Sequence, residues 1–333
     1  MGCEDNPTSP DIAGCTNSSA LNYQEEATVN DDSCYCINDS DTYDSKHCGD
    51  LRVLKDFIDE NPTVYRTLTD ENILPGINVL ELGEQVWSSD TNQRLLKLFI
   101  KNQGLVRIPE TIDNLEYLTV LMLGRNNIDY LPNSLFNMSS LTKLGLWDNN
   151  LSGEISPNFS NLVNLNYLYL DYNQFEGIIP SEIYDLVLLK RLYLARNNLS
   201  GTISSDIESL VNLEELMLNH NSLSGALPEE LWQLTSLTGL WLQNNNLEGD
   251  ISSSISNLIS LENFNIQNND FQFIAQEICN YNFINLINQT YIWDESTQDG
   301  DGEIYYYFNV ENNSFCEPIP TCLENESLLN CLD

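Results

Sequence analysis

The sequence predicts an α/β repeat protein, a solenoid with a concave parallel β-sheet and disulfide-stabilised caps. The first observation is a period, because five leucines stand 24 residues apart, at Leu141, Leu165, Leu189, Leu213 and Leu237. The second is that leucines and variable residues alternate after each of them, as in a strand with one buried face. The third is that all nine cysteines lie outside this periodic region. A fixed period of this length indicates one supersecondary unit stacked on itself.

Each copy follows the pattern L-x-x-L-x-L-x-x-N-x-L and then a glycine, as in LTKLGLWDNNLSGEI at 141–155. One asparagine per copy stands where the chain leaves the predicted strand. A ladder of such side chains can satisfy the unpaired backbone groups of the turn. These asparagines are Asn149, Asn173, Asn197, Asn221 and Asn245. The following glycines allow the next bend, so the repeated residues are predicted to be scaffold and not functional.

The repeated pattern resembles the leucine-rich repeat, and its Ser/Glu-Gly step resembles the plant-type repeats of receptor ectodomains and polygalacturonase inhibitors. The resemblance implies a right-handed leucine-rich-repeat solenoid. Further copies stand on both sides of the regular block, so we expect about ten coils. Numbered 1 to 10, the coils begin at Ile77, Leu95, Leu118, Leu141, Leu165, Leu189, Leu213, Leu237, Leu261 and Tyr305.

We expect four parts along the chain. Residues 1–48 form a Cys- and Asp-rich module, and residues 49–76 form a helical cap over the first coil. Residues 77–315 form the solenoid, with an insertion near 285–303 that lengthens its last step. Residues 316–333 form a Cys-containing cap.

A helix is predicted over residues 50–60, directly before the solenoid. Asp50 is expected to be its N-cap, and Pro62 stands just beyond its end. Its apolar residues share one face, namely Leu51, Leu54, Phe57 and Ile58. A helix with one apolar face is expected to cover the open end of a solenoid.

The cysteines lie in two groups, five within 3–48 and four within 279–331. Such clustering fits an oxidising compartment, so we expect a secreted or cell-surface protein. No signal peptide is visible in the first ten residues, and no apolar run is long enough to span a membrane. Gly2-Cys3 would suit a lipoprotein cleavage site, which makes a lipid anchor at Cys3 an expectation.

The stretch from Gly14 to Cys34 resembles the short G-C-T…D-D-x-S-C module of exported, often marine, bacterial proteins. In that module two cysteines bracket the unit, which implies a Cys15–Cys34 disulfide. We expect a second one between Cys36 and Cys48.

The segment CEPIPTC, together with the last cysteine, resembles the cysteine-bearing C-terminal caps of leucine-rich-repeat proteins. We expect disulfides Cys279–Cys316 and Cys322–Cys331 there. Four cysteines allow three pairings, so the connectivity is open at this point.

The net charge is −37, from 13 basic and 50 acidic residues. This balance argues against nucleic acids and anionic membrane surfaces as general partners. Only two histidines occur and no catalytic or phosphate-binding motif is present, so neither an enzyme nor a cofactor is predicted. Cys34, Cys36, His47 and Cys48 lack the usual zinc spacing, and the acidic loop 294–303 lacks the calcium-loop glycine. Disulfides and a solvated loop explain these residues better, and no metal site is predicted.

The variable residues of the predicted strands carry the functional signal. They hold seven of the 13 basic residues and eight acidic ones, so positive charge is concentrated on one face of an acidic protein. Aromatic residues share this face and suit sugars, anionic groups or peptides. The predicted ligand-binding residues are Lys97, Phe99, Lys101, Arg125, Lys143, Trp147, Tyr167, Tyr169, Tyr172, Arg191, Tyr193, Arg196 and Trp241. The alternative is that these side chains only pack on one another.

We therefore expect a non-enzymatic recognition protein that binds its ligand on the concave face of coils 2 to 7. The basic patch favours an acidic polysaccharide, and the resemblance implies carbohydrate, peptide or protein partners. A structural adhesin, a spacer or an ice-binding solenoid stays open, although ice binding calls for a flat array of small polar residues. A polysaccharide-related enzyme is the remaining alternative, for which no acid/base pair is found.

Overall fold

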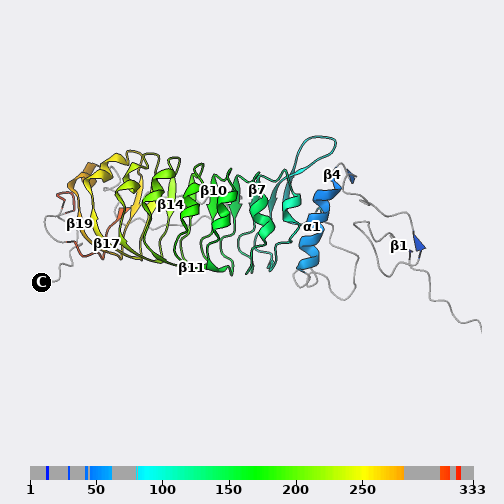
Figure 1. The fold of residues 1–333 in the computed structure, drawn as a ribbon, viewed down its shortest axis with the longest axis horizontal. Helices are drawn as coiled ribbons and strands as arrows, with labels where there is room; N and C mark the ends of the chain where they lie inside the picture. The colour runs from blue at the N-terminus through cyan, green and yellow to red at the C-terminus, as the bar shows by residue number, and fades with distance from the viewer. Residues whose placement is uncertain are drawn as a thin grey trace, which may run out of the picture.

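The protein forms an elongated solenoid in the computed structural model, with helix α1 (Cys48–Glu60) at one end and the last coils at the other (Figure 1). The structure describes residues 46–61, 80, 82–280, 308–315 and 320–323. It also describes the backbone of three short strands before them, β1 (Ala13–Gly14), β2 (Val29–Asn30) and β3 (Thr42–Tyr43).

Several predictions concern residues outside this described set. They are the lipid on Cys3, the Cys15–Cys34 disulfide, the acidic loop at 294–303 and most of both caps. Cys48 is described and takes part in a disulfide, but its partner lies outside the set. The Cys36–Cys48 pairing therefore stays a prediction.

A long sheet of ten strands runs the length of the solenoid, with one strand per coil. Its strands are β5 (Glu84–Trp87), β6 (Leu95–Phe99), β7 (Val120–Met122), β8 (Lys143–Gly145), β10 (Tyr167–Tyr169), β12 (Arg191–Tyr193), β14 (Glu215–Met217), β16 (Gly239–Trp241), β18 (Asn263–Asn265) and β20 (Phe308–Asn309). From β6 to β20 all neighbours are parallel, and equivalent positions of successive coils are paired, as in Tyr167↔Arg191. The parallel sheet predicted from the leucine spacing is confirmed.

A short sheet of six parallel strands forms only in the coils that carry the Ser/Glu-Gly step and in the coil that follows them. Its strands are β9 (Ser152–Glu154), β11 (Gln174–Gly177), β13 (Asn198–Gly201), β15 (Ser222–Ala226), β17 (Asn246–Ile251) and β19 (Asp270–Ile274). The glycine of each step has a positive φ, 78° at Gly153 and 76° at Gly177, which a side chain would strain. The predicted bend therefore lies inside this second sheet.

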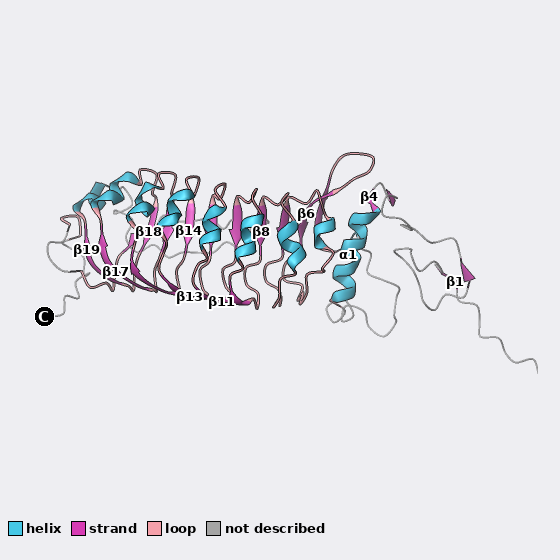
Figure 2. Ribbon diagram, viewed as in Figure 1, coloured by secondary structure: helices cyan, strands magenta, loops and turns pink. Residues whose placement is uncertain are grey.

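Short 3-10 helices follow one another along the side opposite the long sheet (Figure 2). They are η2 (Ile112–Asn114), η3 (Asn133–Asn137), η4 (Pro157–Asn161), η5 (Ser181–Asp185), η6 (Ser205–Ser209), η7 (Glu229–Gln233), η8 (Ser253–Asn257) and η9 (Gln276–Asn280). Several begin with a Ser cap, as where the Ser156 hydroxyl accepts from the Asn158 N–H. Each contributes a buried apolar side chain, such as Phe159, to a continuous core lined by the repeat leucines.

The asparagine ladder is confirmed atom by atom. Asn149 donates from Nδ2 to the carbonyls of Leu146 and Leu123, at 3.0 and 3.1 Å, and its Oδ1 accepts from the Ile128 N–H at 3.0 Å. The same pattern recurs at Asn173 and in every later coil through Asn313. One side chain thus satisfies backbone groups of its own coil and of the preceding one.

Helix α1 extends further than predicted, and Asp50 is not its N-cap. The cap is His47, which makes no side-chain capping hydrogen bond, and Asp50 lies in the first turn. The Asp50 carboxylate is buried, pairs with Arg94 at 2.9 Å and accepts from the Leu95 N–H at 2.7 Å. A longer-range partner has therefore displaced the local cap, and this contact fastens the helix to the first parallel strand.

The expected first coil at Ile77 is wrong. Its strand is β5, four residues later than the Leu80–Leu82 position, and it runs antiparallel to β6, with Gln85 opposite Leu98. The first coil has no preceding coil to define its register, so a hairpin covers the sheet edge instead. The regular parallel coils begin at Leu95.

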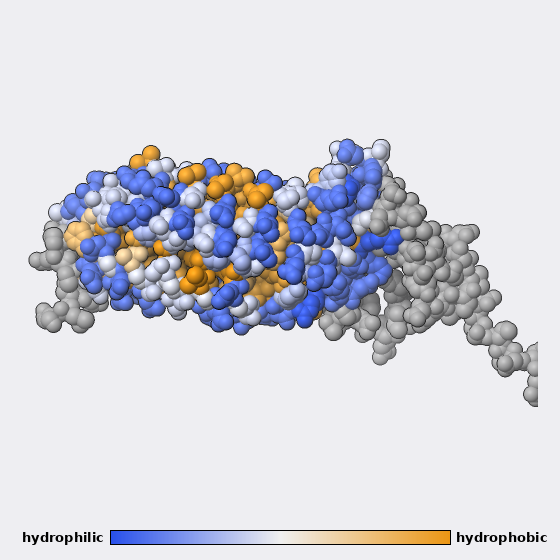
Figure 3. All heavy atoms as spheres, viewed as in Figure 1, coloured by the Kyte–Doolittle hydropathy of each residue, from blue (hydrophilic) through white to orange (hydrophobic). Residues whose placement is uncertain are grey.

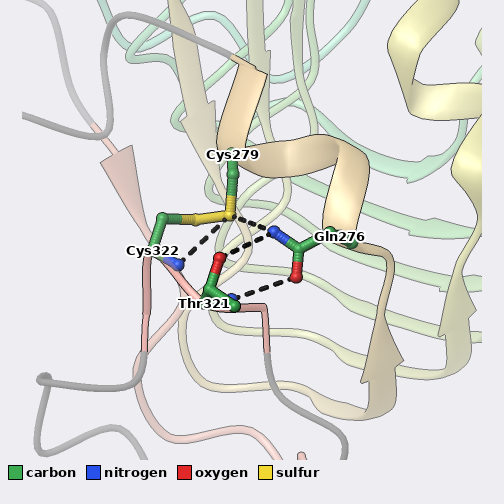
Figure 4. The surroundings of a disulfide bond; sticks show 4 residues. All are labelled: Gln276, Cys279, Thr321 and Cys322. Carbon is green, nitrogen blue, oxygen red and sulfur yellow. Dashed lines mark hydrogen bonds between the residues drawn. A yellow bond between two sulfur atoms is a disulfide. The ribbon is translucent and has the colours of Figure 1, made fainter.

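The C-terminal disulfides are also corrected. Cys279 is bonded to Cys322, with Cα atoms 5.6 Å apart, so neither Cys279–Cys316 nor Cys322–Cys331 forms (Figure 4). Beside this bond, the Gln276 side chain accepts from the Thr321 N–H at 3.0 Å and donates to its hydroxyl at 3.1 Å. These contacts hold 320–323 against η9, and only tertiary packing could select this pairing.

Candidate functional site

In each coil, the outer face of the long sheet is formed by the strand residues on either side of the central leucine, by the residue after the next leucine and by the turn residue that follows, which in coil 4 are Lys143, Gly145, Trp147 and Asp148. In coil 4, Leu144 and Leu146 lie in the solenoid core, whereas Trp147 belongs to a separate cluster on the outer face. Asp148 follows in the turn with a φ of 53° and is exposed. This surface, the outer face of the long sheet, is the predicted concave face.

The aromatic residues expected to be exposed on this face are mostly buried against one another. Tyr169 and Tyr193 have ring centroids 4.8 Å apart, and the Trp147 and Tyr169 rings meet edge-on at 6.5 Å. They belong to a second apolar cluster of Phe99, Met122, Trp147, Tyr169, Tyr193, Ala195, Met217 and Trp241. This layer matches the packing alternative, because its rings bury one another and leave little surface for a ligand.

Glycines under the two tryptophans explain why the rings can pack so closely. A Cβ on Gly124 would lie 2.2 Å from the Trp147 ring, and one on Gly145 would lie 2.5 Å from it. Trp241 covers Gly239 in the same way, again at 2.2 Å. Because these glycines have no side chain, the flat tryptophan rings can lie over them. The sequence alone does not reveal this packing, since Gly124 and Trp147 belong to different coils.

The basic residues of the middle coils are engaged within the protein. Arg191 pairs with Glu215 at 3.2 Å, and the Tyr193 hydroxyl donates to the same carboxylate. Lys190 pairs with Glu214 at 2.8 Å. Burial, followed by the charge of Glu215, raises the pKa of Tyr193 well above its ordinary value. The predicted positive charge is therefore largely balanced here by carboxylates of the next coil.

Lysines towards the N-terminal end lie over aromatic rings. The Lys143 Nζ is 4.7 Å from the centroid of Tyr167, and the Lys101 Nζ is 5.5 Å from that of Trp147. Such cation–π contacts contribute about 0.5–1 kcal/mol at exposed sites and more where the cation is desolvated, as at the buried Lys143. Lys97 is exposed beside them, and Phe99 and Arg125 complete this end.

The turn residues of nine coils all have positive φ, between 53 and 59°. They are Asn102, Arg125, Asp148, Tyr172, Arg196, His220, Asn244, Asn268 and Asn312. Asn, Asp and His tolerate this left-handed conformation, whereas a bulky side chain costs about 1–2 kcal/mol there. Tyr172 and Arg196 adopt it in adjacent coils, with the guanidinium 5.0 Å from the ring centroid.

A cavity of 320 Å³ opens on the outer face across coils 5 to 9. Its walls combine two predicted turn residues, an apolar floor and a series of carboxamides. The lining residues are Asp171, Tyr172, Ala195, Arg196, Met217, Asn219, His220, Trp241, Gln243, Asn244, Asn265 and Gln267. Three of these, Tyr172, Arg196 and Trp241, were predicted from the sequence as ligand-binding. The other nine lining residues were not predicted to bind a ligand. The sequence signal that points to several of them is a change at the outer positions, where Asn and Gln replace charged residues in the later coils.

Asp171 is the buried acid of this cavity. Its side chain is 3 % exposed, and its Oδ1 has no hydrogen-bond partner among the described residues. Burial raises the pKa of the carboxyl to about 7, and the nearby charge of Asp148 adds to the rise. The Gln243 Oε1 is a second buried acceptor without a partner in the described part of the chain.

Four turn residues on one side of the cavity are joined by hydrogen bonds. Asn312 donates to Asn268 at 2.6 Å, Asn268 donates to Asn244 at 2.7 Å, and the Asn244 amide meets the His220 Nε2 at 3.2 Å. Burial, followed by the charge of Arg196, lowers the pKa of His220. A neutral imidazole can accept from Asn244, so the row is consistent with an uncharged His220.

The structure also bears on the metal and membrane predictions. Within the described ranges, no three His, Cys, Asp or Glu side chains are grouped as metal ligands. In that same part of the chain, no helix has the length and apolar character needed to cross a membrane.

The short sheet gives no uniform array of small polar groups. Its outward side chains include Glu154, Glu176, Glu248 and Asp270 among serines and asparagines, all four of them exposed. Apolar patches interrupt a mostly polar surface over the middle coils (Figure 3). This mixture is unlike the regular surface that ice binding calls for.

Comparison with known proteins identifies the repeat. Family models described as leucine-rich repeat match residues 139–199, 212–234 and 236–258. The fold is a leucine-rich-repeat solenoid. The structure is similar to the plant peptide hormone receptor RGFR1 in complex with RGF2, with 32 % identity, a TM-score of 0.53 and 56 % of this chain covered.

A second similar structure is the Arabidopsis receptor kinase HAESA in complex with the peptide hormone IDA and the co-receptor SERK1. It has 27 % identity and a TM-score of 0.56 over 66 % of this chain. The chain spans only 30 % of RGFR1 and 33 % of HAESA.

A plant ice-binding protein shares the fold over 82 % of this chain and 89 % of its own, with a TM-score of 0.59 and 21 % identity. At that identity the likeness concerns architecture alone. A search of curated proteins finds no match to this sequence.

Proposed function

We propose that this protein is a non-enzymatic recognition protein, secreted or on the cell surface, that binds a protein or peptide on the outer face of the long sheet. The cavity across coils 5 to 9 carries the proposal, because two buried acceptors in its lining, Asp171 Oδ1 and Gln243 Oε1, have no hydrogen-bond partner among the described residues. Binding sites are commonly such hollows, with an apolar floor and a few convergent polar groups. The centre of the site moves from coils 2 to 7 towards coils 5 to 9.

The turn conformation of Tyr172 and Arg196 supports the proposal. Both have a φ of 54°, where Asn would be less strained, yet neither contributes to the apolar core. Strained residues that the fold does not require are often retained for binding. Tyr172 is 44 % exposed, Arg196 is exposed and both line the cavity, so an incoming ligand would meet them first.

A peptide is a better fit than the acidic polysaccharide expected from the sequence. Lys190 and Arg191 already pair with carboxylates, so the middle of the face offers less positive charge than the sequence suggests. The titles of the similar receptor structures name peptide hormones as ligands of those proteins. A lipid on Cys3 is compatible with this function, and mass spectrometry of the native protein tests it.

The test begins with a random peptide library displayed on phage and selected on the immobilised protein. Selected peptides are then titrated against a Tyr172→Asn/Arg196→Asn variant. We expect the affinity to fall at least tenfold with no loss of thermal stability, because Asn suits both turn conformations.

Arg125→Asn is the matched control, since Arg125 has the same turn conformation in coil 3 but does not line the cavity. It should leave the affinity within about twofold. A library that yields no specific peptide, or peptides that bind both variants equally, contradicts the proposal.

A further inference from the structure

We propose that the cavity receives a basic side chain of the partner, a guanidinium or ammonium group held by Asp171. This inference rests on the proposed function and names the chemistry of its anchor. Two buried atoms of the cavity lining, Asp171 Oδ1 and Gln243 Oε1, have no hydrogen-bond partner in the described part of the chain. Both are acceptors, so the group that completes them must donate. Guanidinium and ammonium groups only donate. Asp171 and Gln243 hold the same repeat position three coils apart, roughly 14 Å at about 4.8 Å per strand, so the cationic group is held by Asp171 and does not reach Gln243.

Among the described residues, no cationic side chain pairs with the Asp171 carboxylate. The nearest acidic charge, Asp148 of the preceding coil, acts against ionisation of Asp171. Arg196 from the next coil lies over the Tyr172 ring, and His220 from the coil after that meets Asn244. These are the charged and titratable groups that face the cavity in the described structure. An incoming cation would therefore supply the missing counter-charge of a buried acid, which a carboxylate needs in order to stay ionised there.

The walls of the cavity suit the rest of such a side chain. Ala195 of the next coil and Met217 of the coil after it offer apolar surface for its methylene groups, and the Tyr172 ring, which already carries the Arg196 guanidinium on one face, lies beside Asp171. At longer range, a net charge of −37 attracts a basic partner before contact. A neutral sugar is the competing occupant, because the carboxamides could bind hydroxyl groups. A neutral sugar has no positive charge, so its affinity should not depend on whether Asp171 is ionised, whereas the affinity of a cationic side chain should.

The test uses two tripeptides that differ only in charge, N-acetyl-Gly-Arg-Gly-amide and its citrulline counterpart, titrated by ligand-observed NMR. The full-length protein should bind the arginine peptide at pH 8 at least tenfold more tightly than the citrulline peptide. At pH 6 the arginine affinity should fall about tenfold, because a carboxyl with a pKa of about 7 is then mostly protonated.

Asp171→Asn should abolish both the preference for arginine and the pH dependence. Glu176→Gln, at an exposed carboxylate of the short sheet that does not act on Asp171, should preserve both. The Asn at 171 keeps the shape of the side chain, and circular dichroism checks that the variant folds.

Equal affinity for the two tripeptides, or arginine binding that survives Asp171→Asn, overturns the inference. So does binding of methyl glucoside at pH 6 and pH 8 alike, which would identify a sugar site. Library peptides that depend on Tyr172 and Arg196 but contain no required Arg or Lys would leave the proposed function standing while this inference falls. If only the tripeptides bind, the proposed function falls instead.

Discussion

At the scale of single residues, the outer face combines two kinds of buried side chain. The aromatic rings are satisfied by packing over Gly124, Gly145 and Gly239, whereas Asp171 is buried without a partner for one oxygen. Burial of an unpaired acid opposes folding, so its presence in a regular repeat needs another reason. Such local conflicts are expected at functional positions.

Asp171 predicts how stability depends on pH. Its pKa rises from 3.8 to about 7 on folding, so between these values the unfolded chain releases a proton that the folded protein keeps. The free energy of unfolding should therefore fall as pH rises from about 4 to about 7, by at most about 4 kcal/mol. Asp171→Asn should raise the melting temperature at pH 8 and change it little at pH 4.

Calorimetry at the two pH values measures this effect, with Glu176→Gln as the exposed control. A variant that is less stable than the wild type at pH 8 would show that the carboxylate has an internal partner.

At the scale of one coil, the scaffold asparagine replaces several backbone partners at once. Asn197 accepts from the Phe175 N–H at 2.9 Å and donates to the carbonyls of Leu170 and Leu194. The short sheet, by contrast, depends on the glycine of the Ser-Gly step. Each coil is therefore stabilised by the ladder asparagine, which follows the strand of the long sheet, and by the glycine, which allows the bend within the short sheet.

Asn197→Ala should be strongly destabilising. It leaves one buried N–H and two carbonyls with fewer partners, and each unsatisfied buried group costs about 1–3 kcal/mol. We expect a loss of about 2–5 kcal/mol in chemical denaturation. Asn198→Ala at the exposed neighbour should change stability by no more than about 0.5 kcal/mol. A similar small effect at both positions would contradict the role of the ladder.

At the scale of the whole molecule, the acidic charge is the dominant feature. A net charge of −37 on one elongated solenoid creates self-repulsion that the few described ion pairs cannot offset. Repulsion between exposed charges is screened by salt within about 10 Å at 0.1 M ionic strength. The same charge favours basic partners over nucleic acids.

Salt should therefore stabilise this protein. Raising sodium chloride from low to near-molar concentration should increase the melting temperature by several degrees, because screening acts on the folded state, where the charges are close together. Differential scanning fluorimetry across a salt series measures this, with an uncharged osmolyte as the reference. A melting temperature that falls on adding salt would indicate that attractive surface pairs dominate instead.

The sequence by itself determined the leucine-rich solenoid, the parallel strands, the asparagine ladder and the glycine bends. These follow from the sequence because every interior coil has the same neighbours, so one local pattern specifies both the strand and its packing. Sequence reasoning also identified Tyr172, Arg196 and Trp241 as variable residues of this face. Alternation with Leu240 and Leu242 assigns Trp241 there, whereas Tyr172 and Arg196 lie in the turn after the strand.

Only the tertiary structure decided what depends on contacts outside the period. It buried Trp147 over the glycines of two coils, bonded Cys279 to Cys322, and turned β5 antiparallel where no earlier coil precedes it. It also left Asp171 and Gln243, which hold the same repeat position three coils apart, as buried acceptors in the wall of one cavity. The repeat specifies where each side chain points, and the neighbouring coils decide whether it finds a partner there.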